Sequence, residues 1–342
     1  MNDKSPSSTP PTGPGCTLAR PWLVADIGGT NARFGWLADG ADEVAHVRSL
    51  AGAAFNGPAA AARAYLADLS ARLGTQYQAP RAAAFAVATA VGSDQVALTN
   101  SGWRFSRQAT QQDLGLDGLV LLNDFEALAL ALPRLKREQV RAIGPAIPSA
   151  SGALAVIGPG TGLGVAGIVP TAQGWVPVPG EGGHASLSAA DDFESALLAA
   201  VRRQHAHVSA ERLLSGIGLP VLQQAVAAVL GQPAAALSAE DIVERGLARQ
   251  DAVCERTVDA FCALLGSFAG NVALVLGARG GVYIGGGIVP RLGERFFESR
   301  FRERFEAKGR FQDYLRAIPT ALITDTLVAL TGAAVALEQH GR

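Results

Sequence analysis

An acidic side chain stands where a buried strand gives way to a helix, a place at which it could do chemistry. The apolar residues 119–122 predict the strand, which ends at Asn123 and Asp124 before an Ala/Leu-rich helix that stops at Pro133. Ligands of α/β sheets bind beyond the carboxyl ends of strands. Asp124 could therefore act as a general base and accept a proton from a hydroxyl group under attack. Because Asp is also a favoured helix N-cap, capping is the stronger interpretation when these residues are taken alone.

Two glycine-rich turns are candidate phosphate-binding sites. The first begins at Asp26 and reads Asp-Ile-Gly-Gly-Thr-Asn, and the second spans residues 158–164 and reads Gly-Pro-Gly-Thr-Gly-Leu-Gly. Apolar residues flank both, so each is predicted as strand, tight turn, strand; neither is the strand-to-helix turn of a dinucleotide site or a Walker loop. Glycines let backbone N–H groups approach a phosphate closely, and Thr30 and Asn31 add donors. Asp26 could hold Mg²⁺ through water. The alternative for the first turn is an ordinary glycine hairpin.

Further polar residues are candidates for holding a polyol. Glu181 and His184 are three residues apart in a glycine-rich loop, which suits hydrogen bonds to hydroxyl groups, although a solvated loop explains them equally well. Asn100 lies in a turn before Trp103, and a plain Asn turn is its alternative. Glu211 is predicted in the first turn of a short helix capped by Ser209, where the helix dipole alone would account for it.

Alternating strands and helices must position these residues, which predicts an α/β protein. Residues 285–287 are a third glycine cluster, at the end of a predicted strand, where a flat ring such as adenine could lie against the backbone. The principal expected helices cover residues 59–73, 188–203, 251–277 and 327–337, and a further helix is capped at Ser238. The principal strands cover residues 21–25, 82–88, 95–98, 154–157, 281–284 and 321–323.

Composition bounds the class of protein. The chain has 342 residues, 49% hydrophobic and 17% charged, enough for two domains. A formal net charge of −1 gives no electrostatic footprint for nucleic acid or an anionic membrane. We expect no apolar run near the ~20 residues that span a bilayer. The three scattered cysteines, Cys16, Cys254 and Cys262, favour a reducing cytoplasm. Residues 1–20 are rich in Pro, Ser, Thr and Gly and are expected to be a disordered tail.

Six motifs in one order make the chain resemble the bacterial glucokinase family, part of the larger group of sugar kinases, actin and heat-shock chaperones. The resemblance covers residues 22–337. The motifs are Asp26-Ile27-Gly28-Gly29-Thr30-Asn31-Ala32-Arg33, Leu122-Asn123-Asp124-Phe125, Gly160-Thr161-Gly162-Leu163-Gly164, Pro179-Gly180-Glu181-Gly182-Gly183-His184, Ser209-Ala210-Glu211-Arg212 and Gly285-Gly286-Gly287-Ile288-Val289-Pro290-Arg291. Ile217 departs from the family, because Pro is common at that position, and Ser101-Gly102 is also unusual.

The resemblance implies two ribonuclease-H-like domains with a cleft between them, the actin-like ATPase fold. We expect a small domain of residues 21–134 with about 322–342, and a large domain of residues 135–321. ATP phosphates would lie between the two glycine hairpins. Such enzymes transfer a phosphoryl group from ATP, with Mg²⁺, to the 6-hydroxyl of glucose at the entry to glycolysis. The family is commonly a homodimer, and we expect a cytoplasmic enzyme.

The resemblance also implies roles for individual residues. Matching the sugar-binding positions are Asn123, Asp124, Glu181, His184 and Glu211, with Asp124 also the base; Asn100 is added from its turn. For ATP the residues are Asp26, Ile27, Gly28, Gly29, Thr30 and Asn31, then Gly160, Thr161 and Gly162, then Gly285, Gly286 and Gly287 at the adenosine. Two alternatives stay open: a kinase of another hexose, such as mannose or glucosamine, and a non-catalytic regulator that binds sugar or ATP.

Overall fold

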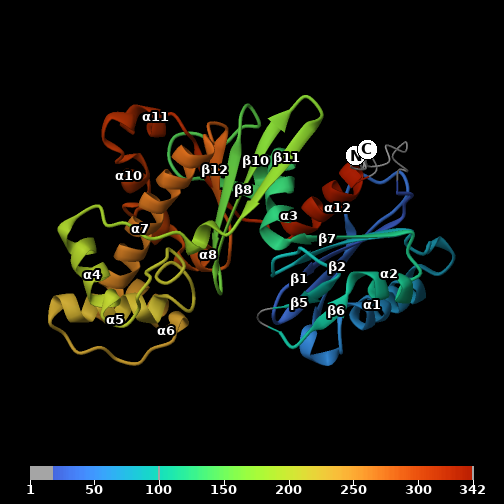
Figure 1. The fold of residues 1–342 in the computed structure, drawn as a ribbon, viewed down its shortest axis with the longest axis horizontal. Coiled ribbons are helices and arrows are strands. Elements are labelled where there is room, and N and C mark those ends of the chain that lie inside the picture. Colours follow the sequence, from blue (N-terminus) through green and yellow to red (C-terminus); the bar gives the residue numbers. More distant parts are fainter. Residues whose placement is uncertain (1–17, 99–100, 341–342) are drawn as a thin grey trace, which may run out of the picture. The chain divides into compact units, whose positions relative to one another are not determined.

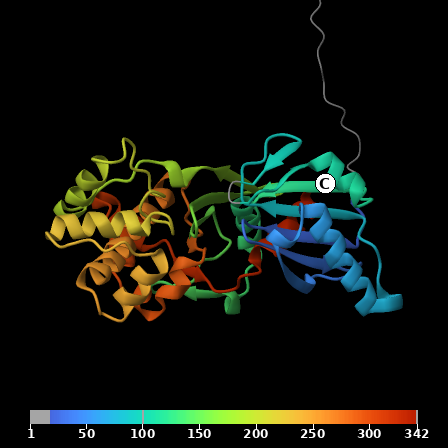
Figure 2. The ribbon, with the colours of Figure 1, turned by 90° about the horizontal axis from the view of Figure 1, so that it is seen from below.

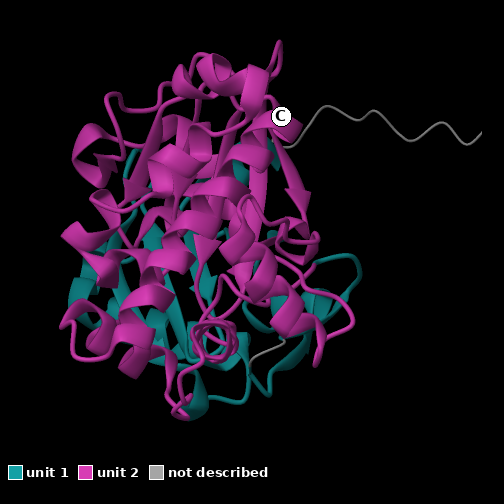
Figure 3. Ribbon diagram, turned by 90° about the vertical axis from the view of Figure 1, so that its left-hand side faces the viewer, with its two compact units in different colours: residues 1–85, 91–121, 333–342 teal, residues 86–90, 122–332 magenta. Residues whose placement is uncertain are grey.

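The structure is a computed structural model that describes residues 18–98 and 101–340. Asn100 and most of the expected tail lie outside the described residues. The chain divides into two compact units (Figure 3). Unit 1 comprises residues 1–85, 91–121 and 333–342, and unit 2 comprises residues 86–90 and 122–332.

Unit 1 is organised on a five-stranded sheet in the order β3-β2-β1-β4-β7. Its strands are β1 (Trp22–Ile27), β2 (Asn31–Leu37), β3 (Ala45–Ala51), β4 (Ala82–Val87) and β7 (Gly118–Asn123). The antiparallel pairing of β1 with β2 confirms the first predicted hairpin, and β3 continues it as an antiparallel third strand. β1 and β4 are apolar along almost their whole length and are buried, which is typical of central strands.

Helices and a small second sheet complete unit 1 (Figure 1). α1 (Pro58–Leu73) begins with Pro at its first position and packs against β2 and β3 through its buried residues, among them Tyr65. α2 (Arg107–Asp113) is capped by the Ser106 hydroxyl, which accepts from the backbone N–H of Ala109. The strands β5 (Gln95–Ala97) and β6 (Arg104–Ser106) form an antiparallel pair.

Unit 2 is organised on a six-stranded sheet in the order β11-β10-β9-β12-β13-β8. The strands are β8 (Val140–Ala142), β9 (Leu154–Pro159), β10 (Leu163–Thr171), β11 (Gly174–Gly180), β12 (Gly281–Ile284) and β13 (Thr320–Ile323). β9, β10 and β11 form an antiparallel meander, which confirms the second predicted hairpin. β12 pairs in parallel with both β9 and β13. Each sheet therefore carries a meander of three consecutive strands at one side, and the next two strands follow in order.

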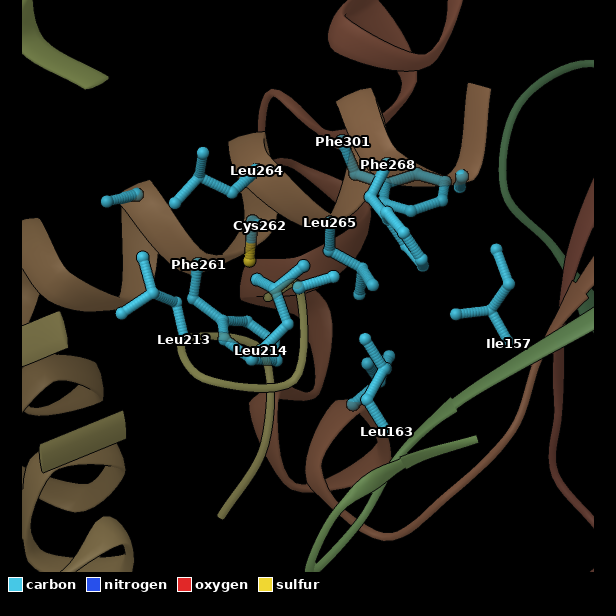
Figure 4. Close-up of a cluster of buried hydrophobic side chains, with 14 of the residues drawn as sticks. Ile157, Leu163, Leu213, Leu214, Phe261, Cys262, Leu264, Leu265, Phe268 and Phe301 are labelled. Carbon is cyan, nitrogen blue, oxygen red and sulfur yellow. The ribbon is translucent and has the colours of Figure 1, made fainter. Parts of the chain in front are cut away.

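Helices occupy much of the rest of unit 2 (Figure 2). They are α3 (Asp124–Ala131), α4 (Asp192–Arg202), α5 (Leu219–Leu230), α6 (Ala239–Leu247), α7 (Ala252–Leu276), α8 (Ile288–Leu292), α9 (Glu294–Phe297), α10 (Phe301–Glu306) and α11 (Gln312–Arg316). The terminal helix α12 (Val328–His340) crosses from unit 2 into unit 1 at residue 333. The hydrophobic core of unit 2 joins the sheet to α7: Ile157 and Leu163 pack with Leu213, Leu214 and the apolar side chains of α7 (Figure 4).

The long helix α7 corrects one sequence expectation. By length and composition it could cross a membrane, so an apolar run of that size does exist in this chain. In the structure, however, 78% of its most apolar window is buried. Gly266 and Gly270 bring it against another backbone: a Cβ atom at Gly266 would stand 2.1 Å from the carbonyl oxygen of Phe301 in α10. This burial is that of a core helix.

Three local predictions also differ from the structure. α4 begins three residues later than expected, because the side chain of Asp191 rather than Ser188 caps it by accepting from the N–H of Glu194. The segment 209–217 forms successive turns and no regular helix. Residues 122–134, expected in the first domain, group with unit 2, because α3 packs on β9, β10 and β11.

Candidate active site

The junction of β7 and α3 is capped by Asn123, not by Asp124. The Asn123 Oδ1 atom accepts from the backbone N–H of Phe125 at 2.9 Å and, at a longer 3.4 Å, from that of Glu126. Its Nδ2 atom donates to the carbonyl oxygen of Thr89 at 3.2 Å. The capping interpretation of Asp124 is therefore wrong: Asp124 is the first residue of α3, and its Oδ1 atom accepts from the N–H of Phe125 at 3.0 Å. The positive end of the helix dipole favours a carboxylate there.

Three polar side chains from two separate segments meet in unit 2. The Nε2 atom of His184 lies 4.0 Å from a carboxylate oxygen of Glu181 and 3.9 Å from one of Glu211. A single turn of 3₁₀ helix, residues 182–184, follows β11; Glu181 immediately precedes this turn and His184 is its last residue. Their side chains are 71% and 61% exposed, whereas that of Glu211 is 23% exposed. The cluster thus offers solvent two carboxylates and an imidazole, groups suited to the hydroxyls of a polyol.

Glu211 is fixed to the second glycine hairpin. One of its carboxylate oxygens, Oε2, accepts from the backbone N–H of Leu163 at 2.8 Å. The same oxygen lies 2.5 Å from where a Cβ atom of Gly162 would stand, so only glycine fits at 162 without a shift. This hydrogen bond joins residues 48 apart in the sequence. The position of Glu211 is therefore explained by the hydrogen bond that it accepts from Leu163, and not by the dipole of a short helix.

The turns that follow Glu211 also donate backbone hydrogen bonds to the second glycine hairpin. The N–H of Gly216 donates to the carbonyl oxygen of Gly160 at 2.7 Å, and that of Ile217 donates to Thr161 at 3.4 Å. Within the hairpin, the N–H of Gly160 donates to the carbonyl oxygen of Gly162 at 2.9 Å. The hairpin thus has a fixed backbone, while the side chain of Thr161 is exposed.

The first glycine hairpin, in unit 1, holds a carboxylate beside a guanidinium. Asp26 and Arg33 face each other across β1 and β2, with 3.6 Å between carboxylate and guanidinium atoms. Burial raises the pKa of the Asp26 carboxyl, and the charge of Arg33 opposes that rise. Gly28 closes the turn by donating to the carbonyl oxygen of Asn31 at 3.0 Å. Among the described residues no group of three or more His, Cys, Asp or Glu side chains could hold a metal ion by itself.

The third glycine cluster follows β12. The N–H of Gly285 donates to the carbonyl oxygen of Ile157 at 2.8 Å. Gly286 has a φ of +76°, and a Cβ atom there would stand 2.3 Å from the carbonyl oxygen of Pro159. Glycine is thus required at 286 by backbone conformation and by close approach to the end of β9.

The structure brings together some of the predicted site residues. Glu181, His184, Glu211 and the Gly160–Gly162 turn form one connected group in unit 2, and Gly286 meets the end of β9 that leads into that turn. Asp26 to Asn31 form the hairpin of unit 1. Sequence reasoning missed the groups that hold three of the predicted site residues. The carbonyl oxygen of Thr89 binds Asn123, the N–H of Phe125 binds Asp124, and the N–H of Leu163 binds Glu211. Backbone groups carry no local signal of such a role.

Comparisons with known proteins agree on one family. A family model described as Glucokinase matches residues 23–340. A glucokinase from Paramagnetospirillum magneticum is 48% identical over 91% of this chain and 96% of its own length. One from Chromobacterium violaceum is 47% identical over 95% and 92%. The crystal structure of a glucokinase from an Antarctic psychrotroph has a TM-score of 0.85 and 40% identity over 93% of this chain and 99% of its own.

Proposed function

The chain belongs to the glucokinase family and phosphorylates glucose, and we propose that Asp124 is the general base and that ATP is the phosphoryl donor. The observation that carries the assignment of a sugar site is the convergence of Glu181, His184 and Glu211 on the second glycine hairpin. These residues lie on loops of unit 2, and a rigid sheet and the α7 core hold the loops in place.

The proposed reaction is a direct phosphoryl transfer. The 6-hydroxyl oxygen of glucose forms a bond to the γ-phosphorus, the bond from that phosphorus to the bridging oxygen breaks, and ADP leaves with the electron pair. A carboxylate oxygen of Asp124 takes the hydroxyl proton. Because the transition state of phosphoryl transfer is loose, catalysis is mostly a matter of positioning and of neutralising charge. The N–H of Phe125, which donates to Asp124, orients the base.

The proposed sugar-binding residues are the three of the polar cluster and three others. They are Glu181, His184 and Glu211, together with Asn100, Asn123 and Asp124. Asn123 uses its oxygen for the cap and one Nδ2 hydrogen for Thr89, which leaves one hydrogen for a sugar hydroxyl. Glu211 uses one oxygen for Leu163 and keeps the other for a ligand. A pocket of such polar groups rejects an analogue that lacks a hydroxyl, because a buried polar group is then left unpaired.

The proposed nucleotide contacts are the glycine clusters. Backbone N–H groups of residues 26–31 and 160–162 would bind phosphate oxygens, and residues 285–287 would lie against adenosine. Mg²⁺ typically binds through one or two carboxylates, water and substrate phosphates. Asp26 fits that habit as a single, mostly buried carboxylate. When bound, the ion would neutralise phosphate charge, while Arg33 keeps Asp26 paired.

We also propose that units 1 and 2 are ribonuclease-H-like domains of the actin-like ATPase fold. The corresponding strand orders of their sheets support this. A homodimer, a cytoplasmic location and a role at the entry to glycolysis are further proposals that rest on the family.

The test is ADP release with Mg-ATP and a panel of hexoses, for wild type and Asp124→Ala. We expect glucose-dependent turnover that falls by about 10²–10⁴-fold in the variant, the range for loss of a general base. The matched control is Asp192→Ala, since Asp192 is the first residue of α4 and also follows an Asx cap. That variant should keep wild-type turnover.

Other outcomes would favour the alternatives. Near wild-type turnover of Asp124→Ala would remove Asp124 as the base. Faster ADP release with mannose or glucosamine than with glucose would assign another hexose. Binding of glucose without ADP release would favour a regulator.

A further inference from the structure

We propose that Phe125 is the positioning residue for Asp124, and that the glycine pair Gly158 and Gly164 forms the slot that receives its ring. The proposal rests on the assignment of Asp124 as the base. It adds three residues to the machinery of the reaction, none of which need touch either substrate.

The slot lies on two neighbouring strands. Gly158 in β9 and Gly164 in β10 are cross-strand partners, and such partners project from the same face of a sheet. A Cβ atom at Gly164 would stand 2.0 Å from the Cδ2 and Cε2 atoms of Phe125. One at Gly158 would stand 2.4 Å from Cζ. The ring therefore lies against the bare backbone of both strands, and a side chain at either glycine would displace it.

Phe125 is linked to Asp124 in two ways. The residues are adjacent in the first turn of α3, so the ring that anchors one also sets the position of the other. The backbone N–H of Phe125 is shared between Asn123 Oδ1 at 2.9 Å and Asp124 Oδ1 at 3.0 Å. Movement of the ring out of its slot would shift the donor that orients the base. A displacement of about 1 Å in a reacting group can cost about 10²-fold in rate.

The start of β10 contacts both Glu211 and the residue that follows Asp124. Gly164 receives the ring beside Asp124, and the adjacent N–H of Leu163 binds Glu211. The start of β10 therefore fixes the position of the base relative to that of a proposed sugar-binding residue. Phe125 is only half-buried, unlike the core residue Phe268. Its contribution should therefore appear more in the rate than in the stability of the fold.

The experiment is a double-variant cycle in the full chain with Phe125→Leu, Gly164→Ala and both together. The readouts are kcat, the KM for glucose and Tm. We expect each single variant to lower kcat by about 10–10²-fold, with the KM for glucose changed by less. A smaller side chain at 125 leaves room for the added methyl at 164. The double variant should therefore recover kcat about tenfold over Gly164→Ala, a coupling typical of residues in contact.

Two controls separate positioning from folding. Gly167→Ala adds the same methyl in the same strand, where it would meet the flexible end of Leu276 at 3.0 Å. Phe268→Leu makes the same change in the core of α7. Both should lower Tm and leave kcat near wild type. If Phe125→Leu does not fold, Gly164→Ala compared with Gly167→Ala still reports on the slot: a loss of kcat only in Gly164→Ala supports it, and wild-type kcat in Gly164→Ala overturns it.

Wild-type kcat in Phe125→Leu, or singles that simply add in the double variant, would overturn the proposal. The role of Asp124 is judged separately by Asp124→Ala. A loss in that variant together with no loss in Phe125→Leu removes the slot and keeps the base.

Discussion

The two glycine hairpins look equivalent in the sequence but hold their glycines for different reasons. In unit 1, a Cβ atom at Gly28 would find its nearest neighbour, the carbonyl oxygen of Asn31, at an ordinary 3.6 Å. In unit 2, Cβ atoms at 158, 162 and 164 would stand 2.0–2.5 Å from Phe125 or Glu211. At Gly28 the first hairpin leaves space for a side chain, space that the proposed phosphate could fill. The second is filled by Phe125 and Glu211 at positions 158, 162 and 164, whereas a Cβ atom at Gly160 would meet nothing within 4 Å.

The carboxylates at the two hairpins also differ in where they come from in the sequence. Asp26 is paired across its own hairpin with Arg33, a partner seven residues away in the sequence. The carboxylate at the second hairpin belongs to Glu211 and comes from a distant segment. The turn of unit 1 is held by its own strands and by one outside backbone contact, the N–H of Gly52, which donates to the carbonyl oxygen of Thr30 at 2.8 Å. The turn of unit 2 is instead held by partners from α3 and from residues 211–217. The second should transmit a local change to the sugar-binding groups, and the first should not.

Among the variants that compare the two hairpins, the largest expected effect is that of a methyl group on the second hairpin. In Gly162→Ala the added methyl would displace the flexible end of Glu211. The variant should lower the free energy of unfolding by about 1 kcal/mol, the size of one lost hydrogen bond, and should lower kcat/KM for glucose by about 10²-fold. Gly28→Ala should unfold at the wild-type temperature and change only the KM for ATP. Thermal unfolding and steady-state kinetics of the pair measure the contrast. Equal losses of stability in Gly162→Ala and Gly28→Ala would contradict the proposed difference between the hairpins.

Glu211→Gln tests whether the carboxylate joins the sugar site to the hairpin. We expect kcat/KM for glucose to fall about tenfold, because a charged hydrogen bond to Leu163 becomes a weaker neutral one. Tm should fall slightly as well. Glu181→Gln is the control, since Glu181 is mostly exposed and should change glucose binding without changing Tm. A Tm loss in Glu181→Gln as large as that in Glu211→Gln would contradict this distinction.

The exposed hydroxyls of Thr30 and Thr161 should behave alike, in contrast to the glycines. Each, changed to Ala, should raise the KM for ATP a few-fold, as expected for loss of one hydrogen bond of about 1 kcal/mol, and should leave Tm unchanged. Thr75→Ala, at an exposed position in unit 1, is the control. An effect confined to one of the two hairpins would show that only that hairpin contacts the nucleotide.

The smallest effect concerns the pH dependence of Asp26. Its pKa is raised by burial in the folded state, so the folded state binds the proton more tightly than the unfolded state does. This contribution favours folding at low pH and is lost as pH rises through the raised pKa. Asp26→Asn should therefore gain stability relative to wild type as pH rises from the ordinary pKa of Asp through the raised value. The gain should be absent below the ordinary pKa of Asp and complete above the raised pKa.

Urea unfolding of both proteins across that pH range measures the difference. A relative stability that falls with rising pH would mean that Arg33 outweighs burial at Asp26.

The sequence determined the elements on which the site stands. The apolar run before Asn123, the flanked glycine turns and the long apolar stretch after Asp251 are local patterns. Their strands, hairpins and helix were therefore predicted close to the observed bounds. The six ordered motifs likewise indicated the family, which the comparisons confirm. Capping was harder to predict, because neighbouring Asx and Ser residues compete for one helix end. Asn123 is the cap where Asp124, taken alone, was the stronger candidate, and Asp191 caps α4 three residues after the expected start of that helix.

Only the tertiary structure decided how the site residues are held. Nothing near Glu211 in the sequence indicates that its carboxylate meets the N–H of Leu163, because that hydrogen bond depends on how distant segments pack. The same holds for the ring of Phe125 on Gly158 and Gly164, and for the burial of an α7 helix that is apolar enough for a membrane. Local preferences choose strand, turn or helix, whereas excluded volume and hydrogen-bond partners are properties of the assembled fold.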